Sequence, residues 1–171
     1  RRVLFRSTGA NVGSLNITTT FSGITNLVGG TGTDSFTFNN GATETSVDGG
    51  TGANTLNLSP NTTPTPDTNT GQGSPALNGT ATGISGFSNI GTVTGPATAA
   101  NTLSGDASGA TYTVTAANGG TLQDTGSAQV LNFGSFQNLV GGAGTDSFVL
   151  SGGTLSRSEE RRVGKECRYR W

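Results

Sequence analysis

Positively charged side chains are missing from most of this 171-residue chain. All nine Lys and Arg lie within the first six residues or from residue 157 onward, and the chain contains no His or Met. Residues 8–156 also lack Cys and Trp, so they cannot assemble a Ser-His-Asp triad, a cysteine nucleophile, a lysine Schiff base or a zinc site. The same stretch carries seven acids and no cation, a charge of −7 that repels polyanions. We therefore expect no enzyme and no nucleic-acid partner.

Long hydrophobic runs are also lacking. No stretch approaches the roughly 18 apolar residues that a membrane-spanning helix needs, so we expect no membrane insertion in this segment. Proline is rare except in residues 59–78, which hold four of the five prolines. Because proline cannot donate to a strand ladder, this segment is either a loop or a linker between two blocks.

The two ends differ sharply in composition from the rest. Residues 1–7 read RRVLFRS and residues 157–171 read RSEERRVGKECRYRW. Both strings resemble translated adapters of sequencing libraries. The resemblance implies that these ends are artefacts and that the native protein, with any signal or anchor, continues beyond them. The alternative for the second string is a genuine basic tail that binds an acidic surface.

What fills residues 8–156 is Gly, Thr, Ser, Asn and Ala, arranged in repeats. Residues 26–36 (NLVGGTGTDSF) and 138–148 (NLVGGAGTDSF) are identical at ten of eleven positions. Residues 49–57 (GGTGANTLN) keep the glycines but carry Asn54 where the other two have Asp34 and Asp146. The glycine pair at 29 therefore returns at 49, after 20 residues.

A short alternating segment follows each glycine turn, and alternation at period two is typical of a strand with one buried face. The apolar members are Leu15 and Ile17, Phe36 and Phe38, Leu56 and Leu58, Tyr112 and Val114, and Phe148 and Leu150. Two strands per repeat of about 20 residues predict an all-β fold, a parallel β-solenoid of β-helix or β-roll type. We place its repeats at residues 8–58 and 79–156. The alternative is a disordered Gly/Ser/Thr segment.

Residues 29–37 (GGTGTDSFT) and 141–149 (GGAGTDSFV) fit the pattern GGxGxDxUx. This pattern resembles the calcium-binding nonapeptide of secreted RTX proteins, in which Ca²⁺ lies between stacked turns with oxygen ligands. The resemblance implies candidate calcium ligands at Asp34, Asn54, Asp48 and Asp146. The cofactor is either none or weakly bound Ca²⁺, since glycine turns also form without metal.

The wider arrangement resembles filamentous-haemagglutinin-type adhesins and other β-strand-repeat proteins of bacterial surfaces. It implies an extracellular, non-catalytic structural or adhesive segment of a large secreted or surface-attached protein. Its expected partners are host or matrix glycans and proteins, or other copies of the same repeat protein. Two alternatives remain: an RTX-like calcium module, and a fragment of a β-helical carbohydrate-active enzyme, since glycosidases need only two carboxylates.

Overall fold

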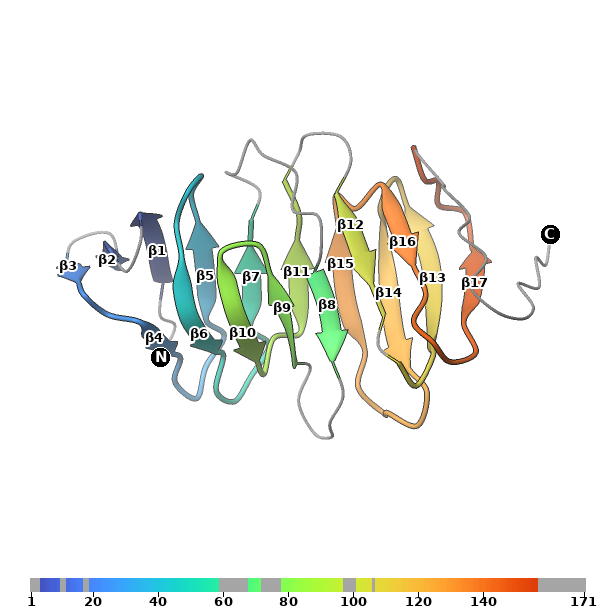
Figure 1. Ribbon diagram of the computed structural model, residues 1–171, viewed down its shortest axis with the longest axis horizontal. Coiled ribbons are helices and arrows are strands. Elements are labelled where there is room, and N and C mark those ends of the chain that lie inside the picture. The colour runs from blue at the N-terminus through green and yellow to red at the C-terminus, as the bar shows by residue number, and fades with distance from the viewer. Residues whose placement is uncertain are drawn as a thin grey trace.

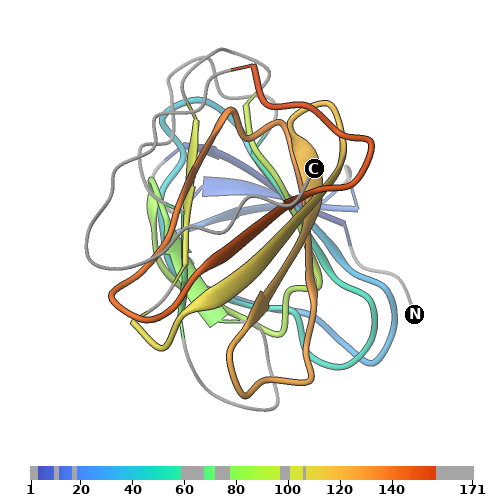
Figure 2. The same cartoon turned by 90° about the vertical axis from the view of Figure 1, so that its right-hand side faces the viewer.

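The computed structural model describes residues 4–9, 12–16, 19–58, 68–71, 78–96, 101–105 and 107–156. These residues form seventeen strands and no helix, which confirms the all-β prediction. The strands form two sheets that run along the long axis of the molecule (Figure 1). Seen along that axis, the sheets lie on opposite sides of a shared interior (Figure 2). No helix in the described residues is long and apolar enough to cross a membrane.

The ten-stranded sheet has the order β17-β13-β14-β15-β11-β7-β5-β1-β2-β3. Its strands are β1 (Leu4–Gly9), β2 (Val12–Leu15), β3 (Thr19–Ser22), β5 (Ser35–Phe38), β7 (Thr55–Asn57), β11 (Thr92–Thr94), β13 (Ala110–Ala116), β14 (Gly119–Asp124), β15 (Leu131–Gly134) and β17 (Ser147–Leu150).

The seven-stranded sheet has the order β16-β12-β8-β9-β10-β6-β4. Its strands are β4 (Asn26–Val28), β6 (Glu44–Asp48), β8 (Thr68–Gly71), β9 (Asn78–Ala81), β10 (Ile84–Ser88), β12 (Thr102–Ser104) and β16 (Asn138–Val140).

In the first part of the chain, the backbone alternates between the two sheets at a fixed spacing. Parallel pairing sets Ser46 of β6 opposite Asn26 of β4, and Thr55 of β7 opposite Ser35 of β5. The register step is therefore 46 − 26 = 20 residues in one sheet and 55 − 35 = 20 in the other. The spacing of the glycine pairs in the sequence is the spacing of these parallel pairs.

Antiparallel hairpins interrupt this pattern, and the repeat spacing did not predict them. β8 pairs with β9, and β13 pairs with β14, so both sheets are mixed. As a consequence, β10 follows β6 at a step of 84 − 44 = 40 residues, and β17 follows β13 at 147 − 111 = 36. The parallel solenoid therefore stays a prediction, while the all-β class is established.

The inward-facing rows are apolar, as the alternation predicted. Register places Phe36, Leu56, Val93 and Phe133 in one row of the ten-stranded sheet, and all four are buried. The other predicted inward pairs that are buried are Phe38, Leu58, Tyr112 and Val114. Leu150 departs from the prediction because it is 48% exposed on the last strand of its sheet.

Strands also occur in two of the segments that composition sets apart. β1 includes residues 4–7 of the adapter-like start and pairs in parallel with β5, and the Phe5 ring stacks on Phe36 at 4.8 Å. β8 lies inside the Pro/Thr-rich segment 59–78. Ile17, the C-terminal string 157–171 and most of segment 59–78 lie outside the described residues.

Candidate metal site at the glycine turns

Two glycine turns stack directly on each other where the chain crosses from one sheet to the other. Turn 29–34 joins β4 to β5, and turn 49–54 joins β6 to β7. Backbone bonds tie the turns together, since the Gly29 N–H donates to Asp48 O at 2.7 Å and the Thr51 N–H donates to Gly30 O at 3.1 Å. A Cβ on Gly49 would fall on the carbonyl oxygen of Asn89, so only glycine fits there.

Asp34 closes its own turn. The residue is fully buried, and its Oδ2 accepts the Gly30 N–H at 2.6 Å. A Cβ on Gly29 would lie 2.5 Å from that same oxygen. The glycine pair and the carboxylate of the first nonapeptide therefore form one compact unit in which the aspartate holds the backbone.

Asn54 links the second turn to the first. Its Oδ1 accepts the Asp34 N–H at 2.9 Å, and it is fully buried. Its Nδ2 donates to Asn89 O at 3.0 Å and, at 3.4 Å, to Gly50 O and Gly52 O. In the RTX-like interpretation, turn carbonyls are calcium ligands. Here an amide nitrogen is directed at the three carbonyls instead.

Asp48 is the last residue of β6 and directly precedes turn 49–54. Its Oδ1 accepts the Asn89 Nδ2 at 2.6 Å and the Gly50 N–H at 2.9 Å. The Asn89 amide, followed by the Gly50 N–H, holds the pKa of Asp48 below its ordinary value of 3.8. Asn89 therefore contacts both residues. Its side-chain amide donates to Asp48, and its backbone carbonyl accepts from the Asn54 side chain.

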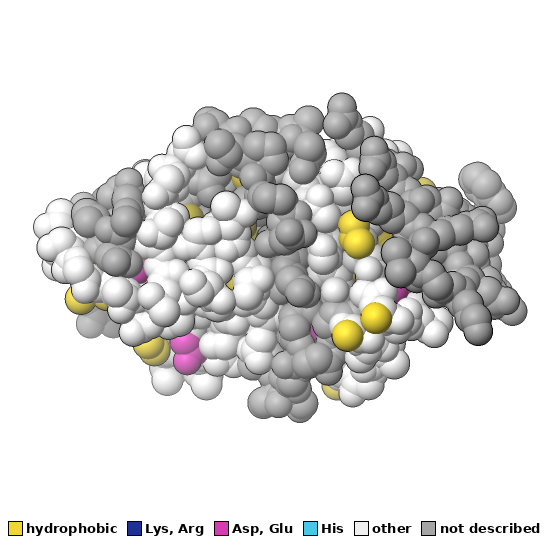
Figure 3. Space-filling model, viewed as in Figure 1, with side chains coloured by type: hydrophobic (Ala, Val, Ile, Leu, Met, Phe, Trp, Pro, Cys, Tyr) yellow, Lys and Arg dark blue, Asp and Glu magenta, His cyan; other side chains and the backbone are white. Residues whose placement is uncertain are grey.

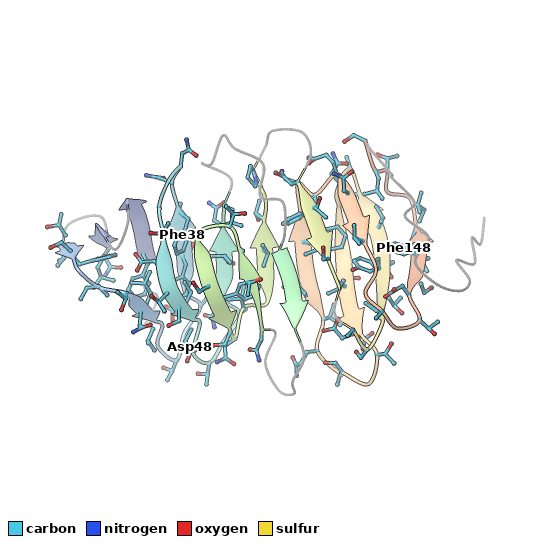
Figure 4. All side chains as sticks on the ribbon, viewed as in Figure 1. Phe38, Asp48 and Phe148 are labelled. Carbon is cyan, nitrogen blue, oxygen red and sulfur yellow. The ribbon has the colours of Figure 1, made fainter. Side chains whose placement is uncertain are left out.

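Asp146 belongs to a separate place. It precedes β17, which lies at the far end of the ten-stranded sheet from β5. Figure 4 places Phe148 of the same strand far from Phe38 and Asp48. The Asp146 Oδ1 accepts the Ala110 N–H at 2.9 Å. The structure therefore brings together Asp34, Asn54 and Asp48, but not Asp146.

A further linkage of this kind, between two buried side chains, occurs in the seven-stranded sheet. The Oε1 of Gln137, before β16, accepts the N–H of Asn101, before β12, at 3.0 Å. The Asn101 Nδ2 in turn donates to Pro96 O and to Ser135 O at 3.0 Å. Both side chains are buried. Neither Asn101 nor Gln137 lies within a nonapeptide, so the motif did not point to them.

These three linkages have one geometry. A polar residue just before a parallel strand accepts, through its side-chain oxygen, the N–H of the residue aligned with it on the neighbouring strand. The accepting residues are Asn54, Gln137 and Asp146. An amide performs this role as well as a carboxylate, so no charge is required. We call these residues strand-entry locks.

The described residues contain no group of three or more acidic, His or Cys side chains that could hold a metal ion. Where described residues form the face seen in Figure 3, they present mainly neutral polar side chains and backbone, with scattered apolar and few acidic groups. Comparison with protein-family models, with curated proteins and with solved structures finds no match.

Proposed function

We propose that the chain is a β-solenoid segment of a secreted or surface-attached bacterial repeat protein and serves a structural or adhesive, non-catalytic role. One observation carries this proposal: strand-entry locks recur at three parallel strand pairs and fix each strand to its neighbour. In a stack of this kind, stability comes from contacts between neighbouring repeats. The 20-residue register step at β4/β6 and β5/β7 supports the same architecture.

The bonding of the polar groups supports a structural role over a catalytic one. Asp34, Asp48 and Asp146 each accept backbone N–H bonds within or between turns. A glycosidase needs two carboxylates that face a common substrate cleft. Asp34 and Asp48 hold the same pair of stacked turns, whereas Asp146 lies at the far end of the ten-stranded sheet. Each of the three carboxylates is bonded to the backbone.

The calcium alternative is weakened by Asn54. Its Nδ2 donates to the carbonyls of Gly50, Gly52 and Asn89. A cation at those oxygens would have to displace this amide, and it would gain no charge from an asparagine. We therefore propose that the glycine turns of residues 29–54 are held without metal.

A binding and turnover screen tests the proposal. The chain is applied to immobilised glycans and extracellular-matrix proteins, and its activity is measured on a panel of soluble polysaccharides. The matched control is the double variant Asp34→Asn/Asp48→Asn, because these two carboxylates lie on the same pair of stacked turns. We expect no released reducing ends from either protein. Reducing ends released by the native chain and lost in the variant would replace the proposal with a carbohydrate-active enzyme.

A further inference from the structure

Three Asn-Gly pairs occur in the sequence, and the fold holds each of them differently. They are Asn40-Gly41, Asn78-Gly79 and Asn118-Gly119. An asparagine that precedes glycine can lose its side-chain amide without an enzyme, because a glycine nitrogen with no Cβ beside it can approach the asparagine side chain. The reaction requires the peptide between the two residues to rotate and to be reached by water. The backbone around each pair therefore decides which pair reacts.

The first pair occupies the middle of a tight, exposed turn. Residues 39–42 join β5 to β6, and the Ala42 N–H donates to Asn39 O at 3.0 Å. Gly41 has a φ of 77°, the conformation that the third residue of a type II turn requires. The hydrogen bond of such a turn joins its first and fourth residues, so it does not hold the peptide between Asn40 and Gly41. Both residues are exposed, and among the described residues nothing outside the adjoining chain lies within 4 Å of the position that a Gly41 Cβ would take.

The third pair, at the turn of the β13–β14 hairpin, is held by hydrogen bonds. The Asn118 N–H donates to Thr154 O at 2.7 Å, and the Asn118 carbonyl accepts the Phe136 N–H at 3.0 Å. The Asn118 Oδ1 accepts the Ser156 N–H at 2.8 Å. Gly119 is buried at the start of β14. Rotation of this peptide would break its bonds, so a reaction here requires the structure to open locally.

The second pair lies inside a sheet. Asn78 and Gly79 belong to β9, which lies between β8 and β10 in the seven-stranded sheet. Register sets Gly79 opposite Thr70 of β8 and opposite Phe87 of β10. A peptide between two neighbouring strands is fixed by the hydrogen-bond ladder. Of the three pairs, the turn pair therefore is the one that combines exposure with a peptide outside a ladder.

We propose that Asn40 is a site of spontaneous deamidation, at which the chain acquires a negative charge as it ages. The Gly41 nitrogen attacks Asn40 Cγ, the Cγ–Nδ2 bond breaks, and the proton of the Gly41 nitrogen passes through water to the leaving ammonia. The product is a five-membered succinimide ring, which water then opens at one of its two carbonyls. Cleavage of the new bond to Cγ leaves an aspartyl residue at position 40. Cleavage of the original peptide bond leaves an isoaspartyl residue, whose backbone runs through the former side chain.

The isoaspartyl form disturbs the start of β6, because it lengthens the backbone of turn 39–42. This turn packs closely against Gly83, where a Cβ would lie 2.5 Å from Ala42 O. The Gly83 carbonyl also accepts the Glu44 N–H at 2.8 Å. A longer turn therefore weakens the contact between Gly83 and the first residue of β6. The aspartyl form only adds one more negative charge to residues 8–156, which hold seven acids and no cation.

The test ages the full chain at mildly alkaline pH and maps the products by mass spectrometry, in which deamidation shifts the mass of the peptide that contains it. Chymotrypsin is used, because all Lys and Arg lie within the first six residues or from residue 157 onward and trypsin would leave the rest uncut. In the folded chain, Asn40 should react at least about tenfold faster than Asn78 and Asn118, which need local opening. In urea the three should react within about threefold of one another, because the fold no longer protects any of them.

Three results overturn the proposal: a rate at Asn78 or Asn118 in the folded chain that equals the rate at Asn40, a reaction at Asn40 that occurs only in urea, and a preference for Asn40 that persists unchanged in urea. The last result would assign the preference to the local sequence and not to the turn.

Variants of the chain separate the site from its consequence. Asn40→Gln should lose the product at position 40, because a longer side chain would have to form a larger ring. Asn132→Gln, at another exposed asparagine, should leave that product unchanged. Asn40→Asp supplies the charge without the longer backbone, so it should keep the slow hydrogen exchange of the Glu44 amide that the aged isoaspartyl chain loses. Persistence of the product in Asn40→Gln overturns the site, and equal exchange at Glu44 in the aged chain and in Asn40→Asp overturns the effect on β6.

Discussion

The two copies of NLVGGxGTDSF have nearly the same sequence but different surroundings. In the first, Phe36 lies between Phe5 and Leu56 and is fully buried. In the second, Phe148 stacks on Tyr112 on one side only, among the described residues, and is partly buried. The local sequence therefore specifies the turn and the strand, while the burial of the strand depends on the neighbouring repeat. We therefore expect the stability of each strand to depend mainly on its contacts with the neighbouring strands.

The largest expected difference is between the two phenylalanines. Phe36→Ala should cost about 3–5 kcal/mol of unfolding free energy, because it removes a fully buried ring. Phe148→Ala should cost about 1–2 kcal/mol, because less of its surface is buried. Paired urea unfolding curves measure both, with Thr37→Ala on the outward face as the control. Equal costs for the two rings would contradict the dependence on neighbours.

Replacing Asn54 tests whether this residue acts as a strand-entry lock or as a metal ligand. Asn54→Ala leaves the Asp34 N–H and three carbonyls without their amide partner and should cost about 2–3 kcal/mol. Asp146→Ala loses the bond to the Ala110 N–H in a less buried position, so it should cost about 1 kcal/mol. Thermal melts in the presence of a calcium chelator compare the two. A null effect of Asn54→Ala would remove the lock as a stabilising element.

Calcium should stabilise the variant Asn54→Asp more than it stabilises the native chain. Asn54→Asp turns a donor into a carboxylate facing the oxygens of Gly50, Gly52 and Asn89, which is unfavourable without a cation. We expect it to melt lower than the native chain in chelator and to recover by about 0.4–1.4 kcal/mol at ~1 mM calcium, the range for a weak extracellular site. The native midpoint should not move. A calcium-dependent rise in the native chain would restore the RTX-like alternative.

The smallest expected effect is on the pH dependence of stability. Hydrogen bonds from Asn89 and then Gly50 hold the pKa of Asp48 below 3.8. A lowered folded-state pKa means that the ionised carboxylate contributes stability in full well above pH 3.8, and that this contribution is lost as the pH falls through the folded-state value. Asp48→Asn should therefore lose less stability than the native chain between pH 6 and pH 3. Parallel declines in thermal midpoint would show that Asp48 is not linked to folding.

The parts of this fold that are visible in the sequence are those set by local chemistry. Alternation placed Phe36 and Leu56 inside, and the glycine spacing matched the 20-residue register step. The hairpin β13–β14 was missed because the alternation at Tyr112 and Val114 fits an antiparallel strand as well as a parallel one. The pair Asn118-Gly119 was the available signal, and Asn118 has a φ of 53° at the hairpin turn.

The candidate site was only partly predictable for a related reason. The motif identified Asp34 and Asn54 as neighbours, and they are hydrogen-bonded. It gave no information on which way the Asn54 amide points, and that orientation decides between a ligand and a donor. Asn89, Asn101 and Gln137 lie outside the nonapeptides, so their roles depend on which strands become neighbours.

Hydrogen exchange at equivalent amides of the two copies tests the central claim most directly. The Asp34 carbonyl accepts the Thr55 N–H of β7, so the Phe36 and Phe38 amides lie on the side of β5 that faces β7. The equivalent Phe148 and Leu150 amides lie on the side of β17 with no described strand. We predict slow exchange at Phe36 and Phe38 and exchange at least about a hundredfold faster at Phe148 and Leu150 in the free chain. Equal protection at both pairs would contradict the claim that the neighbour, and not the local sequence, decides the state of each repeat.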